Sequence, residues 1–329
     1  MDISRIMTYS RRLSLSVFLI VLAGAGFFLG VVLPRGLEKV IELPEISVNA
    51  RTAVILNAGT GEVLYEKNPG AKFPPASTTK VMTAIVAIEN LSPEALIIPD
   101  STVVRVEPTI VGLKPGVEYR FDDLLAAILI RSGNDAAVAI ARAVAGDEKK
   151  FAVMMNDKAS EIGMTDTHFV SASGLPTGKK DLQHTTAKDL AVMMRYALRH
   201  KRILEHMSQK EKNISGSDGL NIYFKTNNKT LVKRENAPWG KTGYTREASR
   251  TFVGTNPSMD PKITFALLKS EDLWNDIFTL YDKGMVIYEL TSRTWRDDLR
   301  DQISVFFKWI RDQRELGKSE LDHVYSARK

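Results

Sequence analysis

Cysteine is absent from the 329-residue sequence. Its absence excludes disulfide bonds and thiolate metal sites, and it removes the usual sequence clue to the redox compartment. Histidine is scarce too: the five histidines include no His-Glu-x-x-His or other close ligand spacing. We therefore expect chemistry that uses neither a metal nor another cofactor.

Two further features of the sequence argue against a dinucleotide cofactor and against nucleic acid as a partner. Gly59-Thr60-Gly61 lacks the third glycine of a dinucleotide-binding loop and fits a hairpin turn. The formal net charge is only +6, and no basic stripe with interleaved aromatic residues is found, so nucleic acid is not an expected partner. This mild positive excess suits an anionic envelope or membrane surface instead.

The amino-terminal part predicts a membrane anchor. Residues 1–12 carry three arginines and are expected to be cytoplasmic, and the uncharged run Leu13–Leu33 is long enough to span a bilayer. The bulk of the chain would then lie outside the cytoplasm, on the extracytoplasmic side of the cell membrane. A cleaved signal remains the alternative because Ala23-Gly24-Ala25 resembles a cleavage site, but the length of the run favours an anchor. Residues 34–48 are predicted to be a tether.

Regular secondary structure is predicted from Asn49 onward. Short β-branched and apolar segments predict strands at 53–56, 63–65, 222–224, 230–232, 251–253 and 263–268. The first two strands and the next two are expected to form hairpins, the second hairpin around Asn227-Asn228. Longer apolar segments predict a helix that begins near Ser77 and helices at 121–130, 136–144, 148–162, 190–198 and 272–290. Residues 208–220 are predicted to be a polar loop.

The stretch Pro75–Lys80, which reads Pro-Ala-Ser-Thr-Thr-Lys, contains the first candidate for chemistry. Proline disfavours helix before it, so Ser77 is predicted to lie in the first turn of a buried helix. Residues three apart share a helix face, which places the Lys80 ammonium beside the Ser77 hydroxyl. Burial lowers the pKa of a lysine, and a neutral lysine can take a proton from serine. Ser-x-x-Lys recurs at 326–329, and alone it indicates only a helix cap and a solvated lysine.

Two other short motifs lie downstream. Ser132-Gly133-Asn134 falls on a polar break between two predicted helices. Lys241-Thr242-Gly243 occurs once, and on an edge strand it would line a cleft with a cation and a hydroxyl. Glycine there would let a substrate backbone approach closely.

In this order the three motifs resemble those of the low-molecular-weight penicillin-binding D-alanyl-D-alanine carboxypeptidases. The flanks 75–84, 129–137 and 174–191 are similar as well, and the resemblance covers about residues 49–285. It implies a serine D,D-peptidase of the β-lactamase/transpeptidase-like fold. This is an α/β (α+β) fold in which helices, including a helical subdomain, flank an antiparallel sheet. The catalytic domain would span residues 49–290.

The resemblance assigns the acylation chemistry to three side chains. Ser77 would attack the carbonyl of a peptidoglycan stem peptide ending in D-Ala-D-Ala, and Lys80 would be the general base. Ser132 would relay a proton to the leaving amine. The resemblance also implies that β-lactam antibiotics acylate Ser77.

Substrate binding would involve the remaining motif residues. Asn134 would hold the substrate amide together with Lys80. Lys241 and Thr242, in the motif that ends at Gly243, would bind the terminal carboxylate. The backbone N–H groups of Ser77 and Tyr244 would form the oxyanion hole.

Three relatives with different activities remain as alternatives. A D,D-endopeptidase of peptidoglycan crosslinks shares all these motifs, and a non-catalytic peptidoglycan-binding relative would have lost them. A β-lactamase is disfavoured because Gly133 stands where class A enzymes prefer aspartate, and no Glu-x-x-Leu-Asn deacylation loop is found. His184 lies outside every nucleophile motif and is interpreted as a structural loop residue.

Two departures from the family pattern are visible. After the Lys-Thr-Gly motif the family usually continues to Ala-Gly, whereas this chain reads Ala248-Ser249, which leaves the fold intact and changes the loop behind the site. The segment 291–329 is too short for the β-rich domain that many relatives carry. Within it, residues 291–315 predict an amphipathic helix that packs on the domain, on a partner or on a membrane surface, followed by a disordered tail.

Overall fold

The computed structural model describes residues 43–107, 109–176 and 182–292. The predictions for the basic segment, the membrane run, most of the tether and the carboxy-terminal segment beyond residue 292 lie outside the described residues. In the part of the chain that is described, no helix is both long and apolar enough to cross a bilayer.

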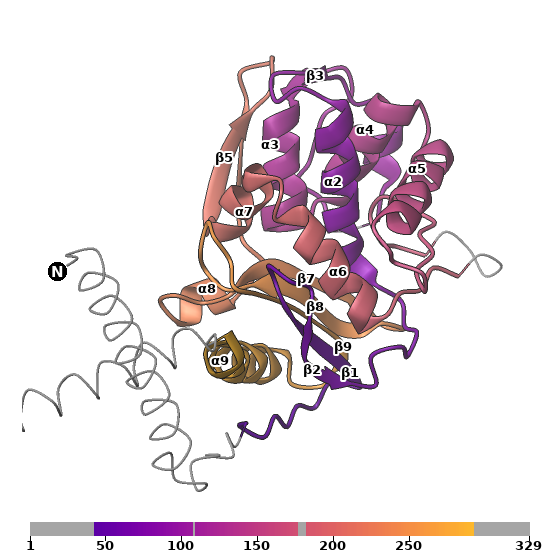
Figure 1. Ribbon diagram of the computed structural model, residues 1–329. Helices are drawn as coiled ribbons and strands as arrows, with labels where there is room; N and C mark the ends of the chain where they lie inside the picture. The colour runs from indigo at the N-terminus through magenta and orange to yellow at the C-terminus, as the bar shows by residue number, and fades with distance from the viewer. Residues whose placement is uncertain (1–42, 108, 177–181, 293–329) are drawn as a thin grey trace, which may run out of the picture. The chain divides into compact units, whose positions relative to one another are not determined.

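A five-stranded antiparallel sheet with the order β2-β1-β9-β8-β7 organises the domain (Figure 1). Its strands are β1 (Thr52–Asn57), β2 (Val63–Lys67), β7 (Trp239–Thr245), β8 (Ser249–Thr255) and β9 (Ile263–Ser270). The sheet contains the predicted first hairpin and both later strands. It also confirms that Lys241 lies on an edge strand, because β7 has only β8 as a neighbour.

Helices cover both faces of this sheet. The helical elements are η1 (Ala76–Thr79), α2 (Lys80–Asn90), η2 (Ser101–Arg105), α3 (Phe121–Ala126), η3 (Ala127–Arg131), α4 (Asn134–Ala145), α5 (Glu148–Glu161), α6 (Ala187–Ala197), α7 (Lys201–Ser208), α8 (Thr230–Lys233) and α9 (Leu273–Ser292). Two small antiparallel pairs accompany them, β3 (Leu96–Ile97) with β4 (Tyr119–Arg120) and β5 (Glu211–Ser215) with β6 (Asn221–Lys225). Helix α9 packs on one face of the sheet, whereas α6 and the group α2–α5 lie on the other (Figure 1).

The two apolar cores follow from the alternation of side chains along β1. Val54 and Leu56 point into the core shared with α2, α4 and α6, whereas Ala53 and Ile55 point into the core beneath α9. Successive side chains of a strand face opposite sides, so a strand buried on both faces reads as a continuous apolar run. Burying one such Ile or Leu side chain stabilises the fold by roughly 1.5–3 kcal/mol.

The packed domain begins slightly before residue 49. Ile46 and Val48, which the sequence placed in the tether, pack against the α9-side core. The Lys67 ammonium also donates to the Val48 carbonyl, at 2.7 Å. The reason is the apolar character of Ile46 and Val48, which a tether in solvent would leave exposed.

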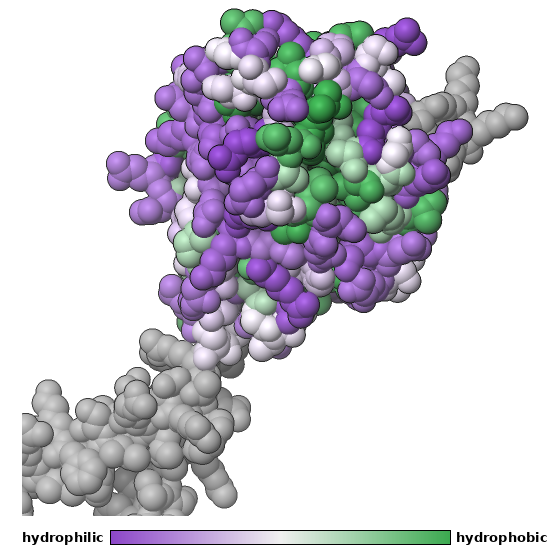
Figure 2. Space-filling model, turned by 90° about the horizontal axis from the view of Figure 1, so that it is seen from above, coloured by the Kyte–Doolittle hydropathy of each residue, from purple (hydrophilic) through white to green (hydrophobic). Residues whose placement is uncertain are grey.

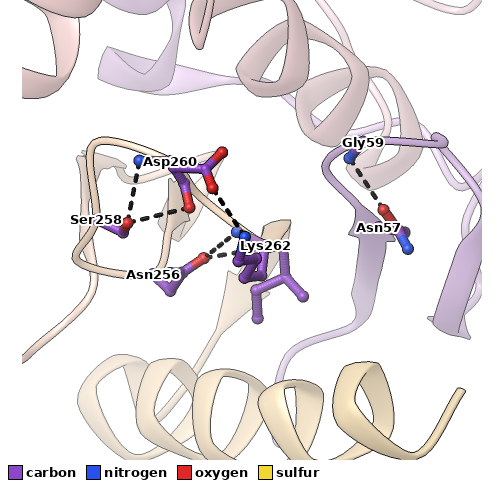
Figure 3. A network of polar contacts seen from close by, with 7 residues as sticks. Asn57, Gly59, Asn256, Ser258, Asp260 and Lys262 are labelled. Atoms are coloured by element: carbon purple, nitrogen blue, oxygen red, sulfur yellow. Dashed lines mark hydrogen bonds and ion pairs between the residues drawn. The ribbon is translucent and has the colours of Figure 1, made fainter. Parts of the chain in front are cut away.

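Side-chain caps shape two neighbouring turns of the sheet (Figure 3). The Asn57 Oδ1 accepts from the Gly59 amide at 2.9 Å, within the glycine-containing turn predicted between β1 and β2. In the β8–β9 turn, the Asn256 Oδ1 accepts from the Lys262 amide at 2.8 Å, and the Lys262 ammonium contacts the Asp260 carboxylate at 2.8 Å. The two asparagines thus accept from backbone N–H groups of the turns, whereas the aspartate pairs with a side-chain ammonium.

The second predicted hairpin is wrong. Strand β6 pairs with β5, which lies within the stretch 208–220 predicted to be a loop, and residues 230–233 form the short helix α8. The asparagines do not form a two-residue turn. The Asn228 Oδ1 accepts from the Thr230 amide and hydroxyl, at 3.2 and 2.6 Å, which starts a helical turn. Only Ile214 of β5 is buried, and the rest of the strand is polar. The sequence therefore lacks the apolar pattern that would have predicted a strand there.

An apolar surface lies at the end of the helical layer. Seen from above in Figure 2, hydrophobic side chains gather near the middle of the face. Strand β3 reaches the top of Figure 1, and it and the segment that follows it expose Leu96, Ile98 and Val104 by 61%, 58% and 64%. In Figure 1, β3 lies at the end of the helical layer that is farthest from the sheet.

Candidate active site

Ser77 and Lys80 meet at the start of α2. Ser77 lies in the 3₁₀ turn η1 and α2 begins at Lys80, so the serine precedes the α-helix by one tight turn. Side chains three residues apart eclipse one another in a 3₁₀ turn, which brings the two groups into line. The Lys80 Nζ lies 3.1 Å from the Ser77 Oγ, as the motif predicts.

Two fixed acceptors hold the other side of the Lys80 amine. Its Nζ is 2.6 Å from the Asn134 Oδ1 and 2.7 Å from the Ser173 carbonyl oxygen. The Asn134 amide cannot be reversed without loss, because its Nδ2 donates to the Glu107 carbonyl at 2.8 Å. A neutral amine has two hydrogens, and both are taken by these acceptors. Its lone pair is therefore left facing the Ser77 hydroxyl.

Burial sets the protonation of Lys80. The side chain is fully buried, and this desolvation lowers its pKa well below the usual lysine range, helped by the positive charge of Lys241. The carboxylates of Asp135 and Glu148 act in the opposite direction and raise that pKa. The net shift of the pKa is downward, toward the neutral amine that a general base requires.

Ser132 faces the cleft from a break in the helical layer. It follows the π-helical turn η3 and adopts the left-handed conformation, with φ 71°. The Lys241 Nζ from β7 lies 2.9 Å from its Oγ and 2.8 Å from the Thr242 carbonyl. Lys241 is 1% exposed, and burial lowers its pKa to about 7.

A pair of asparagines fixes Ser132 relative to β7. The Asn227 Nδ2 donates to the Arg131 carbonyl at 2.7 Å, next to Ser132, and its Oδ1 accepts from the Arg131 guanidinium at 3.1 Å. The adjacent Asn228 donates to the Pro238 carbonyl at 3.0 Å, directly before β7. The two residues thus join the Ser132 turn to the strand that carries Lys241.

Asp135 holds the loop that follows residue 108. Its carboxylate accepts from the amides of Gly112 and Leu113 at 2.8 and 3.1 Å and from that of Val111 at 3.0 Å. The backbone N–H of Asn134 donates to the Thr109 carbonyl at 2.7 Å. The residue after the Ser-x-Asn motif therefore builds one wall of the site through backbone contacts.

Strand β7 lies directly against the Ser77 turn. A Cβ added to Gly243 would come within 2.8 Å of the Ser77 amide nitrogen and 2.4 Å of the Thr251 Oγ1. Glycine is required here because the strand backbone approaches the Ser77 amide so closely. Thr242 is partly exposed and Tyr244 is 67% exposed, so both reach solvent on either side of Gly243 along β7.

The structure thus brings the predicted site residues together from three separate parts of the chain. Ser77 and Lys80 come from η1 and α2, Ser132 and Asn134 from the η3–α4 turn, and four consecutive residues from β7: Lys241, Thr242, Gly243 and Tyr244.

Sequence reasoning missed one direct contact of Lys80. The Ser173 group that accepts from the lysine is a backbone carbonyl, which any residue carries, so no side-chain motif could reveal it. The nearest sequence signal is the next residue, Gly174, which the structure places at a φ of +83°.

Two other features lie away from the nucleophile. His184 pairs with His168 through the backbone in an isolated bridge, in keeping with a structural role. A cavity of about 480 Å³ is lined by residues of α5, α6 and the β1–β2 turn, among them Arg195 and Tyr196, and includes none of the predicted site residues.

The family model of the S11 peptidases, described as D-alanyl-D-alanine carboxypeptidase, matches residues 38–270. The chain belongs to this family. The match covers every site residue named above and confirms the resemblance drawn from the three motifs.

The similar proteins agree with this membership. DacB2, a D-alanyl-D-alanine carboxypeptidase of Mycobacterium tuberculosis, is 31% identical over 72% of this chain and 83% of its own length. DacC of Escherichia coli is 31% identical over 75% of this chain, which spans 63% of that relative. The crystal structure of a D-alanyl-D-alanine carboxypeptidase from M. tuberculosis superposes with a TM-score of 0.69 and 29% identity, covering 75% of this chain and 95% of that one. The fold predicted from the family is therefore confirmed.

Ser249 stands where the family usually has glycine, in the Ala-Gly pattern after the Lys-Thr-Gly motif. Its φ is +54°, in the left-handed region that glycine adopts most readily, so this S11 member tolerates serine in a glycine conformation. The Ser249 hydroxyl donates to the Ser270 carbonyl at 3.2 Å. The β7–β8 turn is retained, as expected.

Proposed function

We propose that this chain is a serine D,D-carboxypeptidase that removes the terminal D-alanine from peptidoglycan stem peptides and is acylated by β-lactams. One observation carries the proposal: the fully buried Lys80 amine lies 3.1 Å from the Ser77 hydroxyl, with its two other neighbours able only to accept hydrogen bonds. The neutral lysine therefore acts as the base that activates serine. Membership of the S11 family supports the choice of substrate.

Acylation begins with proton transfer from Ser77 to Lys80. The Ser77 Oγ bonds to the carbonyl carbon of the penultimate D-alanine while its proton moves to the lysine lone pair. The negative charge that forms on the carbonyl oxygen is bound by the backbone N–H groups of Ser77 and Tyr244. The close approach of β7 to the Ser77 amide supports this pairing, and one such donor contributes about 10²–10³ in rate.

The leaving group departs on the side of Ser132. The C–N bond breaks as the Ser132 hydroxyl passes its proton to the amine nitrogen, and the proton that Lys80 took from Ser77 replaces it, which returns Lys80 to its neutral form. The contact of Lys241 with the Ser132 Oγ supports this relay. Lys241 and Thr242 bind the terminal carboxylate until D-alanine leaves. Water then attacks the ester carbon and gives a proton to the neutral Lys80, which passes it to the Ser77 Oγ as the ester C–O bond breaks.

Substitution of the nucleophile tests the proposal. Ser77→Ala should abolish labelling by a fluorescent penicillin and release of D-alanine from a D-Ala-D-Ala peptide. The stability should change by no more than about 1 kcal/mol, because Lys80 keeps two of its acceptors. Ser101→Ala, at an exposed serine on η2, is the matched control and should label as the wild type does.

Undiminished labelling of the Ser77→Ala variant would remove Ser77 from this role. Adding a crosslinked peptidoglycan dimer to the same assay distinguishes the related endopeptidase activity. Faster cleavage of the dimer than of the monomeric peptide would replace the carboxypeptidase assignment.

We also propose that the uncharged run 13–33 anchors the protein in the cell membrane with the catalytic domain outside the cytoplasm. The length of the run and the arginines before it support this. Full-length protein should remain with membranes during alkaline carbonate extraction. The double variant Leu19→Arg/Leu22→Arg should be released, because each central arginine costs about 2.5–3.5 kcal/mol in a bilayer. Leu37→Arg, outside the run, is the control, and release of the wild type would contradict the anchor.

A further inference from the structure

Glu148 is linked to Lys80 indirectly, by hydrogen bonds to the backbone of residues 172–173. It is the first residue of α5, and its Oε1 accepts from the Ala172 amide at 3.0 Å. The next residue, Ser173, provides the carbonyl that accepts from the Lys80 Nζ at 2.7 Å. The Ala172 carbonyl is itself fixed by the Thr83 hydroxyl at 2.6 Å. The segment 172–173 is therefore held between α2 and the amino end of α5.

The fold supports a carboxylate at this position. Asp147 caps α5 by accepting from the Lys150 amide at 2.8 Å, so the helix begins at Glu148. The amino end of a helix favours a negative charge. Burial raises the pKa of Glu148, whereas the Ala172 amide and the positive charges of Lys80 and Arg142 lower it. The carboxylate thus has one backbone donor, and it interacts electrostatically with Arg142 and with the protonated form of Lys80.

We propose that Glu148 is a positioning residue for acylation, which holds the 172–173 backbone whose carbonyl accepts from Lys80 and supplies a negative charge that acts on that lysine. This deepens the proposed function and rests on it. The charge has a direct consequence for proton transfer. Glu148 and Asp135 both oppose the combined effect of burial and of Lys241 on the Lys80 pKa. Removing one of the two carboxylates makes Lys80 lose its proton at a lower pH.

Two substitutions separate the hydrogen bond from the charge. Glu148→Gln keeps an acceptor oxygen for the Ala172 amide but removes the charge. Its acylation by benzylpenicillin should reach the wild-type maximum within about twofold, with the rising limb of the pH profile displaced by roughly 0.5–1 unit to lower pH. Glu148→Ala removes the acceptor as well. It should lower the maximal acylation rate about tenfold, because the Ser173 carbonyl that positions Lys80 is no longer held in place.

Asp147→Asn is the matched control, since it makes the same change of charge one residue away and keeps a helix cap. Its pH profile and maximal rate should match the wild type. A pH limb for Glu148→Gln that coincides with the wild type would overturn the role of the charge, and an unchanged rate for Glu148→Ala would overturn the role of the contact. If the alanine variant does not fold, the glutamine variant alone decides, because a purely structural role leaves its limb in place. Failure of the wild type to be acylated would instead reject the proposed function.

Discussion

The two buried lysines of the site differ in the groups that surround them. Lys80 contacts one hydroxyl and two fixed acceptors, an arrangement that suits a neutral base. Lys241 has the Ser132 hydroxyl and a carbonyl as neighbours, and burial brings its pKa to about 7. Lys241 therefore changes its charge close to neutral pH. A substrate carboxylate bound beside Lys241, as we propose, would raise that pKa again and favour the charged form.

The pH dependence of substrate selection should reveal this proton on Lys241. Above pH 7 the free enzyme loses the Lys241 charge, so a peptide ending in D-Ala carboxylate loses affinity by up to roughly tenfold per pH unit. The same peptide with a C-terminal amide does not depend on that charge. The measurement is the ratio of kcat/KM for the acid to that for the amide, in which the contribution of Lys80 cancels. The ratio should fall as pH rises from 7 to 9, and a constant ratio would contradict carboxylate binding by Lys241.

At the scale of elements, one glycine controls the contact between the 171–174 segment and the nucleophile turn. Gly174 has a φ of +83°, and a Cβ added to it would lie 1.9 Å from the Ala76 carbonyl oxygen. Ala76 itself has a positive φ of 50°, so the turn before Ser77 is already constrained. The turn cannot move without shifting the serine.

Gly174→Ala should therefore cost both stability and acylation. We expect a loss of about 3–4 kcal/mol, since the backbone strain adds to an overlap with a main-chain atom. Gly163→Ala provides the matched control, because Gly163 has a φ of +88° and no atom within 4 Å of the added Cβ. It should lose only the strain of about 1–2 kcal/mol and retain wild-type acylation. Urea unfolding and penicillin labelling measure both effects, and equal losses in the two variants would show that the overlap is relieved at no cost.

The sequence predicted elements well where motif and periodicity agreed. The apolar run of β9 and the acidic start of α3 were both visible, and so were the positions of the three motifs on a helix start, a turn and an edge strand. Prediction failed where tertiary contacts decide the structure. Asn227 and Asn228 bind distant carbonyls rather than forming a hairpin turn, and the π-helical turn before Ser132 has no local signature. The carbonyl of Ser173 reaches Lys80 only because the chain returns to α2.

For the molecule as a whole, the two ends of the described domain are joined at one buried acid. Asp276 on α9 is fully buried and accepts from the amides of Asn49 and Ala50, at 2.7 and 2.8 Å. It also accepts from the Ser270 hydroxyl at 2.6 Å. The start of the domain is thereby joined to α9 and to the end of β9. Helix α9 packs on the face of the sheet opposite α6, so this junction is separated from the site by the sheet.

Asp276→Asn should weaken the fold and leave the chemistry unchanged. The new amide turns one NH₂ group toward backbone or hydroxyl donors, which leaves a buried donor unpaired at a cost of about 2–4 kcal/mol. Asp282→Asn on the same helix is the control: its carboxylate is half exposed and pairs with Arg234 at the surface, so it should cost no more than about 1 kcal/mol. Urea unfolding measures the difference, and penicillin acylation well below the melting temperature should be the same in both variants. An equal loss of stability in the Asp276→Asn and Asp282→Asn variants would mean that the contacts of Asp276 contribute no more than a surface ion pair. The sheet alone would then hold the start of the domain next to α9.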